Sequence, residues 1–109
     1  FQQHLEAALA GCIALLLVGA AAPAPKLDDL ADPAVAEWLG RAVRDHMPFN
    51  YAGVPAVCLP NGLIDGVPSS MQLVGMPQSD SEILALARRF QTATEHHRAR
   101  PAMLLTEAV

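Results

Sequence analysis

The chain has 109 residues, enough for one domain and too few for two. Hydrophobic residues make up 52% of it and charged residues 17%, which excludes an intrinsically disordered chain and supports a packed core. Seven basic and eleven acidic side chains give a net charge of −4, so nucleic acid is not an expected partner, because its binding needs clustered lysine and arginine.

The N-terminal part of the chain is predicted to form a helix followed by a strand. We assign Phe1–Ala10 to the helix and Cys12–Val18 to a strand that is buried on both faces. The strand assignment follows from a continuous apolar run bounded by Gly11 and Gly19, a pattern that is typical of a strand covered on both sides.

The apolar run Ala7–Ala22 is too short for a membrane-spanning helix, which needs about 20 residues. It also lacks the basic segment that precedes the apolar core of a signal peptide. The letters "LAGC" at Leu9–Cys12 resemble a lipoprotein cleavage box, but the apolar stretch follows that cysteine instead of preceding it. We therefore expect a cytoplasmic protein with no membrane partner; a small secreted or lipid-anchored protein is an alternative.

A Pro-rich connector, Ala22–Pro33, leads into a second predicted helix. Asp32 is a good N-cap and Pro33 suits the first helical position, so this helix is expected to run from Pro33 to about Asp45. Its apolar face consists of residues at helical spacing: Val35, Trp38, Leu39 and Ala42.

Two short apolar runs, Val54–Leu59 and Met71–Val74, are predicted to pair as an antiparallel hairpin. The connector between them contains the turn dipeptides Asn61-Gly62 and Asp65-Gly66, whose residues tolerate positive φ. A hairpin with a long loop is therefore expected.

The last helix has the clearest start signal in the chain. Ser79 can cap it, and Glu82 falls three residues later, which is the pattern of a capping box. The helix is expected to run from Asp80 to about Glu95. Its core-facing stripe consists of Ile83, Leu86, Ala87, Phe90 and Ala93.

No combination of side chains in the sequence makes a complete catalytic or metal site. His96 and His97 are adjacent, so on a helix their side chains point about 100° apart and cannot bind one metal together. Ser69-Ser70 would need Lys26 within hydrogen-bond contact as its base, and nothing in the sequence places that lysine near the hairpin. We expect no catalytic residue, no metal and no cofactor in this chain.

The two cysteines, Cys12 and Cys58, are too few for a disulfide framework, and each lies in an apolar run. Buried free thiols in a reducing compartment are therefore expected. Cys58 could act as a nucleophile only with a histidine in reach. His46 precedes it by 12 residues, but no third group to orient that imidazole is evident, so Cys58 is interpreted as a small buried hydrophobic residue.

The stretch "PFNYAGVPAVCLPNG" and the following "DGVPSSMQLVGMPQSDSEILALARRFQTAT" closely resemble the C-terminal segment of the amidase signature family. The residues that match in order and spacing are Pro48, Phe49, Asn50, Gly53, Pro55, Ala56, Pro60, Gly62, Pro68, Gln72, Leu73, Val74 and Gly75. The match is dense over 48–75, looser over 79–101 and slight before 22. The whole of 1–109 is thus identified as one segment of an amidase-signature domain.

The chain departs from the family pattern at two places. Family members usually carry an acidic residue at the start of the upstream strand and Thr-Pro after it, where this chain has Ala14 and Val18-Gly19. Ser70 stands where the family hairpin has glycine. These departures indicate a divergent member of the family or an incompletely maintained gene.

The resemblance implies an amide hydrolase whose catalytic residues lie outside this chain. Family members use a nucleophilic serine, a second serine on a cis peptide and a lysine, which together activate the attack on the amide carbonyl. These residues belong to the N-terminal and central regions of the family. The resemblance therefore implies the missing N-terminal part of the domain as the partner of this chain, with a homo-oligomer as a further option.

The fold that the resemblance implies is α/β: the C-terminal portion of a mixed β-sheet flanked by helices, incomplete as an isolated domain. A stand-alone, non-catalytic binding or structural module is the alternative. Reading upstream of Phe1 for a serine motif and a lysine would separate the two.

Within this segment, Met47, Phe49 and Asn50 are predicted substrate-pocket residues, and ordinary core is the other interpretation of Met47 and Phe49. Pro55 and Pro60 lack an N–H donor, so they are expected to mark the ends of the strand between them. The predicted structural motif consists of Gly53, Pro55, Pro60, Gly62, Gln72 and Gly75.

Overall fold

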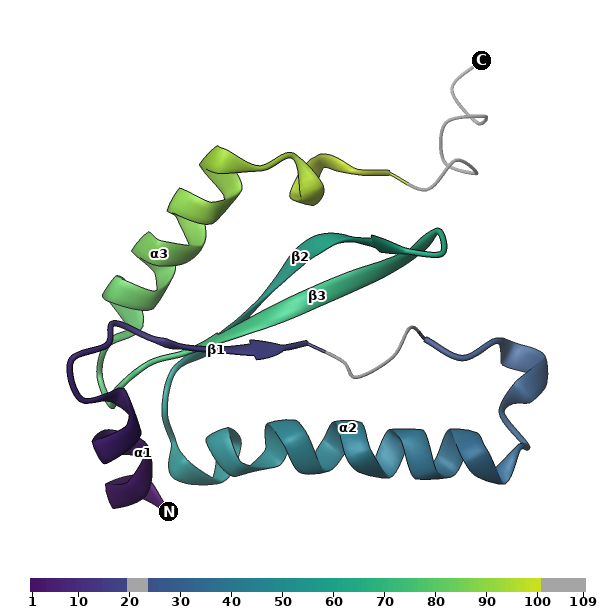
Figure 1. Ribbon diagram of the computed structural model, residues 1–109, viewed down its shortest axis with the longest axis horizontal. Coiled ribbons are helices and arrows are strands. Elements are labelled where there is room, and N and C mark those ends of the chain that lie inside the picture. The colour runs from purple at the N-terminus through teal and green to yellow at the C-terminus, as the bar shows by residue number, and fades with distance from the viewer. Residues whose placement is uncertain (20–23, 101–109) are drawn as a thin grey trace.

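The structure, a computed structural model, describes residues 1–19 and 24–100. Its elements follow in chain order as helix, strand, helix, hairpin and helix, with short 3₁₀ turns before the second helix and after the last (Figure 1). They are α1 (Gln2–Leu9), β1 (Leu15–Val18), η1 (Leu27–Asp29), α2 (Pro33–Ala52), β2 (Ala56–Ile64), β3 (Val67–Val74), α3 (Asp80–Ala93) and η2 (His96–Arg98). The predicted α/β class is confirmed. The first residues of the predicted connector, at 22–23, lie outside the described residues.

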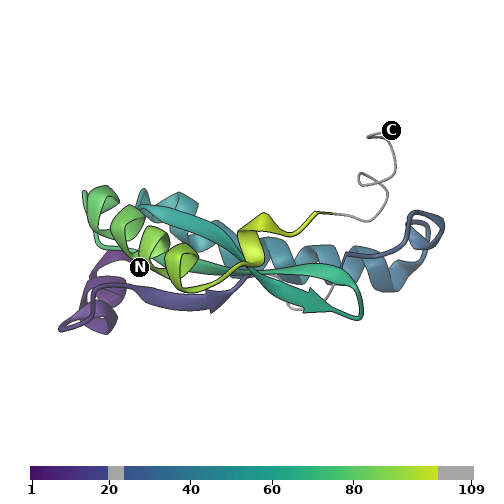
Figure 2. The same ribbon diagram turned by 90° about the horizontal axis from the view of Figure 1, so that it is seen from above.

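The described strands form one antiparallel sheet in the order β1-β3-β2, with β3 in the centre (Figure 2). In the register of β1 and β3, Val74 lies opposite Leu15 and Leu73 lies opposite Leu16. Because successive side chains of a strand point to opposite faces, these two pairs mark the two sides of the sheet. We call them the Val74 face and the Leu73 face.

Helix α1 and the C-terminal end of α2 cover the Val74 face. The buried cluster between them consists of Leu5, Leu9, Phe49, Val54 and Val74. The Phe49 ring also packs edge-to-face against Phe1, with ring centroids 6.2 Å apart. A helix as short as α1 is not stable by itself, so this burial is what holds it in place.

Helix α3 covers the Leu73 face over β2 and β3, on the opposite side of the sheet from α1 and α2 (Figure 2). The buried cluster here consists of Leu59, Leu73, Ile83 and Ala87, with Leu86 and Phe90 packed against it. The predicted apolar stripe is confirmed except at Ala93, which is exposed and ends the helix.

The capping box predicted at the start of α3 does not form. Ser79 precedes the helix, but its hydroxyl donates a hydrogen bond to the carbonyl oxygen of Met76 at 2.7 Å. The carboxylate of Glu82 accepts from the hydroxyl of Ser81 at 3.0 Å instead of returning to Ser79. The helix is therefore fixed by its packing on the sheet and not by a side-chain cap.

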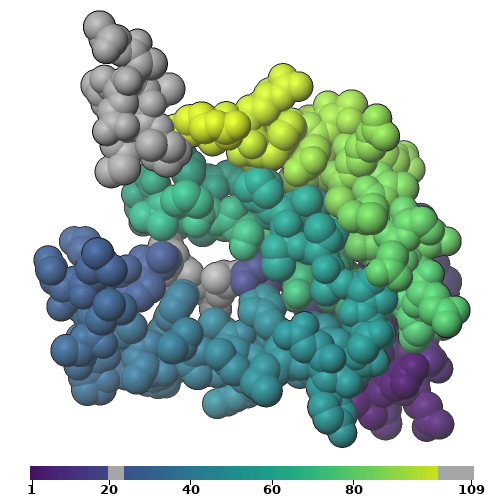
Figure 3. Space-filling model, turned by 180° about the vertical axis from the view of Figure 1, so that it is seen from behind, coloured from purple at the N-terminus to yellow at the C-terminus, as the bar shows by residue number. Residues whose placement is uncertain are grey.

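The start of α2 agrees with the sequence. The side chain of Asp32 accepts a hydrogen bond from the N–H of Ala34 at 2.8 Å, and Pro33 occupies the first turn. On the predicted apolar face, Leu39 is exposed while the other three residues are half-buried. Figure 3 shows α2 running alongside the hairpin, and the helix contributes Phe49, near its C-terminal end, to the buried cluster on the Val74 face. No helix among the described residues combines the length and the apolar character needed to cross a membrane.

The predicted end of α2 near Asp45 is wrong, because the helix continues through Pro48 to Ala52. A proline inside a helix removes a hydrogen bond and costs about 3 kcal/mol, so the local sequence favours an earlier end. The last turn is held by the burial of Phe49 and by Gly53, which caps the helix in the left-handed conformation at φ 64°. Packing and capping therefore outweigh the local cost of Pro48.

β2 and β3 are joined by a two-residue turn at Asp65-Gly66, so the predicted long loop is wrong. Both turn residues have positive φ, 51° and 80°, which is the backbone of the tight hairpin turn that suits twisted strands. The predicted pairing of the two apolar runs is confirmed from Ala56 opposite Val74 to Leu59 opposite Met71.

Pro60 lies inside β2 and does not end it, contrary to the prediction. Its cross-strand partner Ser70 points its backbone carbonyl at β1, where it accepts the N–H of Gly19 at 2.8 Å. Residues of an antiparallel strand point their backbone groups alternately at one neighbour and the other, so Pro60 occupies a site without ladder hydrogen bonds. A bulge at Asn61, before Gly62, then shifts the register.

Two predictions of burial are wrong. Cys12 and Cys58 are both exposed free thiols. In β1, Leu16 and Val18 are 62% and 65% exposed, so this strand is covered on one face only. The reason is that α3 packs on β2 and β3 and leaves the Leu73 face of β1 open among the described residues.

The departures from the family pattern at Gly19 and Ser70 lie opposite each other in the sheet. A Cβ atom built on Gly19 would overlap the hydroxyl of Ser70 and lie 2.7 Å from its carbonyl carbon. The serine therefore fits because its partner has no side chain.

We expect Gly19→Ala to lower the free energy of unfolding by about 1–3 kcal/mol, the usual cost of overpacking. In a Ser70→Gly background the loss should be smaller, because the hydroxyl that clashes is gone while the backbone contact stays. Urea unfolding of the two single variants and the double variant measures this coupling. An equal cost of Gly19→Ala in both backgrounds would contradict the close approach.

Candidate functional site

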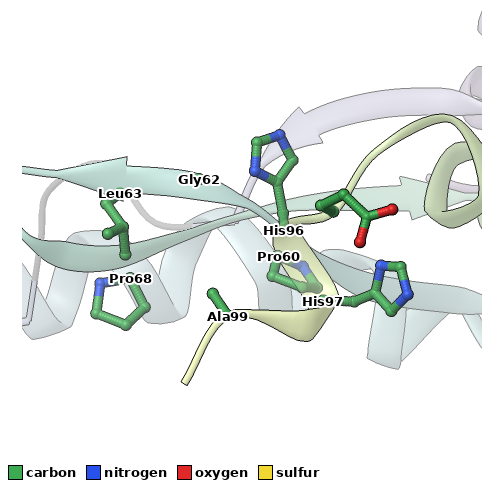
Figure 4. Close-up of a pocket in the computed structure, with 8 residues that line it drawn as sticks. Pro60, Gly62, Leu63, Pro68, His96, His97 and Ala99 are labelled. Carbon is green, nitrogen blue, oxygen red and sulfur yellow. The ribbon is translucent and has the colours of Figure 1, made fainter. Parts of the chain in front are cut away.

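A cavity of about 550 Å³, which we call the hairpin pocket, lies between the β2–β3 hairpin and η2 (Figure 4). Its lining comes from the two strands near the bulge and from the chain after α3. The lining residues are Pro60, Gly62, Leu63, Pro68, Glu95, His96, His97 and Ala99.

The end of α3 positions the imidazoles of this pocket. The hydroxyl of Thr94 donates to the carbonyl oxygen of Phe90 at 3.0 Å as the helix ends, and the chain turns into η2. The ring of His96 stacks on Phe90, with centroids 6.3 Å apart and planes at 28°. Gly62 faces this ring, since a Cβ atom there would lie 3.7 Å from Cε1 of His96.

The polar groups of the hairpin pocket do not converge on one point. The His96 and His97 rings point away from each other in Figure 4. Nδ1 of His97 is buried without a hydrogen-bond partner. No hydroxyl or thiol lines the cavity, and the described part of the chain has no group of three His, Cys, Asp or Glu side chains placed to hold a metal. The pocket can enclose an apolar group, but it offers no nucleophile with a base.

The three predicted substrate-pocket residues are not brought together. Met47 and Asn50 are exposed and line a shallow hollow of about 290 Å³ on the surface of α2. Phe49 points the other way, into the cluster on the Val74 face, where it is 7% exposed. Phe49 is therefore a core residue here, and a substrate role for Met47 and Asn50 stays a prediction.

A part-buried polar pair that the sequence did not predict connects α2 to the central strand. The Nδ1–H of His46 donates to Oε1 of Gln72 at 2.9 Å, and Gln72 is 7% exposed. Cys58 lies opposite Gln72 in the register, so the histidine considered as its base is engaged by the neighbouring glutamine. A lone glutamine in the apolar run of β3 was the signal that such a partner was needed.

The serines considered as nucleophiles have strand roles. Ser69 and Ser70 lie in β3, and no hydrogen bond of the described residues joins either of them to Lys26, which is exposed next to η1. Among the motif residues, Gly53 caps α2, and Pro55 accepts the N–H of Gly75 at 2.9 Å through its carbonyl oxygen. The matched motif thus serves the connection of helix, hairpin and helix.

Comparison with known proteins finds relatives for this chain, although no family model matches it. The A-subunit of glutamyl-tRNA(Gln) amidotransferase from Symbiobacterium thermophilum is 44% identical over 78 residues, which are 72% of this chain and 16% of that protein. The A-subunit of the same enzyme from Streptococcus equi subsp. zooepidemicus is 36% identical over 88 residues, which are 79% of this chain and 18% of that protein.

A solved structure agrees with these matches. The crystal structure of the glutamyl-tRNA(Gln) amidotransferase A-subunit from Thermotoga maritima superposes with a TM-score of 0.72 at 25% identity, over 85% of this chain and 20% of that one. This chain therefore spans less than a quarter of the length of these relatives. From the sequence matches and the shared fold, the chain is a partial homologue of the amidase signature family.

Proposed function

We propose that this chain is the C-terminal structural part of an amidase-signature hydrolase that acts on carbon–nitrogen bonds. Its nucleophilic serine, cis-peptide serine and lysine would lie in an N-terminal region outside this chain. The observation that carries the proposal is a contrast: most of the chain matches a small part of its amidotransferase relatives, yet its described residues contain no nucleophile paired with a base.

The role that fits these residues is that of a scaffold. A central strand packed by helices on both faces is a rigid support, and the His46–Gln72 hydrogen bond fixes α2 against it. In the complete enzyme, the antiparallel sheet would continue into a larger mixed sheet. Met47 and Asn50 would face the substrate side of that assembly, as the sequence predicts.

The first test is activity with and without the missing part. The probe is the Symbiobacterium thermophilum relative from which the 78 matched residues have been deleted, which we call the truncated relative. We expect the 109-residue chain alone to release no ammonia from glutamine or a simple aliphatic amide, because loss of the nucleophile in a serine hydrolase costs about 10⁶ in kcat. The mixture of the two polypeptides should recover measurable turnover.

The control for this test is Ser70→Ala in the present chain. It should leave the activity of the mixture unchanged, because Ser70 is a strand residue in this proposal. Turnover by the chain alone that is lost on Ser70→Ala would overturn the proposal and make this serine the nucleophile.

A stand-alone binding module is a second candidate, favoured by the hairpin pocket, whose surface is mostly apolar and lacks a nucleophile. The two candidates differ in what the isolated chain does. A binding module should unfold cooperatively as a dilute monomer, whereas a segment that lacks its partners should be marginally stable and bind a hydrophobic dye.

A further inference from the structure

We propose that β1 accepts an additional strand along its free edge, and that a helix from the same partner fills the apolar groove beside α3. The partner is the remainder of the amidase-signature domain, so this inference rests on the proposed function and specifies how the two parts join. It follows from the groove, from the spacing of helices and strands, and from the difference between the two edges of the sheet.

The groove lies on the Leu73 face and has a volume of about 440 Å³. One wall is α3 and the floor is β3 and β1. The residues that line it are Ile13, Ala14, Leu16, Met71, Leu73, Leu86 and Phe90, all of them apolar. Ile13 and Leu16 are 66% and 62% exposed, so their apolar surface is left to water by the described residues. Such a groove fits the apolar side of a helix.

The spacing of helices and strands determines what a helix in the groove would need beneath it. Packed helices lie about 8–10 Å apart, whereas neighbouring strands lie about 4.8 Å apart, so each helix on a sheet covers about two strands. Helix α3 already covers β2 and β3. The next helix would therefore cover β1 and one strand beyond it.

The backbone of β1 has N–H groups that point outward and could pair with such a strand. The N–H of Gly19 donates to Ser70 of β3, so by the alternation of antiparallel strands the N–H of Leu17 also points at β3. The N–H groups of Leu16 and Val18 then point at the outer edge, where no described residue pairs with them. Figure 2 shows β1 at the border of the sheet.

The two edges of the sheet differ in how they resist pairing. Edge strands are commonly protected by proline, charged residues or a bulge. β2 carries Pro60 and a bulge at Asn61, whereas β1 reads Leu-Leu-Leu-Val and has none of these features. The unprotected edge is also the one that borders the apolar groove. Both observations therefore place the junction at β1.

The remainder of the domain is a better occupant than a second copy of the chain. The amidotransferase relatives have at least four-fifths of their length outside this segment, since the chain covers 20% of the solved structure. β1 has four residues, and two copies joined through it would bury little, whereas a stable interface needs about 1,200–2,000 Å². A larger partner with both a strand and a helix provides that area.

Amide hydrogen exchange tests the junction. The full 109-residue chain is measured alone and after co-purification with the truncated relative. The amides of Leu16 and Val18 should exchange freely in the isolated chain and slow by about 100-fold or more in the complex. The amides of Leu17 and Gly19 should be protected in both, because β3 already accepts them.

A matched pair of variants tests the groove. Leu16→Glu places a carboxylate in the groove and should weaken binding of the truncated relative by about 100-fold, because burial of an unpaired charge is costly. Leu84→Glu makes the same change of charge at a residue that is 61% exposed on α3 and does not line the groove. It should change the affinity by less than about 2-fold.

The outcomes separate this inference from the proposed function. Recovery of activity without protection of Leu16 and Val18 would leave the proposed function standing and overturn the junction at β1. Absence of binding would count against both. A dimer of the isolated chain that Leu16→Glu dissolves, and that the truncated relative does not displace, would assign the edge to a second copy. If the truncated relative does not fold, exchange on a chimera that carries the segment in one chain gives the same comparison.

Discussion

Ile83→Ala is expected to lower the free energy of unfolding by about 2–5 kcal/mol, the usual cost of removing most of a buried aliphatic side chain. Ile83 is 2% exposed and lies at the centre of the cluster that joins α3 to the Leu73 face. Because no side-chain cap holds the start of α3, this packing is the main attachment of the helix. Urea unfolding followed by circular dichroism measures the loss.

Leu84→Ala is the matched control, since Leu84 is the next residue of the same helix and is 61% exposed. Its effect should stay within about 0.5 kcal/mol. Equal losses for the two variants would mean that α3 does not pack on the sheet through Ile83, and the description of the Leu73 face would be wrong.

Gly75→Ala is expected to lower the free energy of unfolding by about 1–3 kcal/mol, because it would overpack the junction of β3 and α3. A Cβ atom at this residue would overlap the hydroxyl of Ser79 and lie 2.8 Å from Cδ1 of Ile83. The isoleucine is buried and β-branched, so it has little freedom to move. The serine hydroxyl is held by its bond to Met76.

Gly40→Ala, in contrast to Gly75→Ala, is expected to stabilise the protein. Gly40 lies in the interior of α2, and nothing lies within 4 Å of the site that a Cβ atom would occupy. The change should raise the free energy of unfolding by up to about 1 kcal/mol, because alanine loses less backbone entropy than glycine in a helix. If Gly40→Ala lowered the free energy of unfolding as much as Gly75→Ala, the open surroundings of Gly40 and the crowded surroundings of Gly75 would both be contradicted.

The sequence predicted those parts of the fold that depend on periodic apolar residues. The pairing of the two apolar runs and the stripe from Ile83 to Phe90 are both read from spacing, and both are confirmed. The hairpin loop was not predictable in this way. Asn61-Gly62 and Asp65-Gly66 are both good turn signals, and only the register of the strands decides between them.

Other differences between the predictions and the structure come from contacts between residues that are distant in the sequence. The end of α2 depends on the burial of Phe49 against α1, which no local rule contains. The same burial separates Phe49 from Met47 and Asn50, so the structure does not bring the three predicted pocket residues together. The exposure of Cys58 likewise follows from its place on the face of β2 that α3 does not cover, whereas the next residue, Leu59, is buried under α3. For the candidate site, the family motif pointed to Met47, Phe49 and Asn50, but the tertiary packing determined which way each side chain points.

The two-residue turn at Asp65-Gly66 has a consequence for the order in which the sheet assembles. β2 and β3 are adjacent in the chain, so their first pair, Ile64 with Val67, closes almost no loop. Leu15 and Val74 pair across slightly more than half of the chain, so their pairing costs more loop entropy and takes longer to form. The hairpin should therefore form within about 1–10 μs, and β1 should join it late. During synthesis, β1 emerges before β3. Until β3 emerges, both edges of β1 are unpaired and open to mispairing.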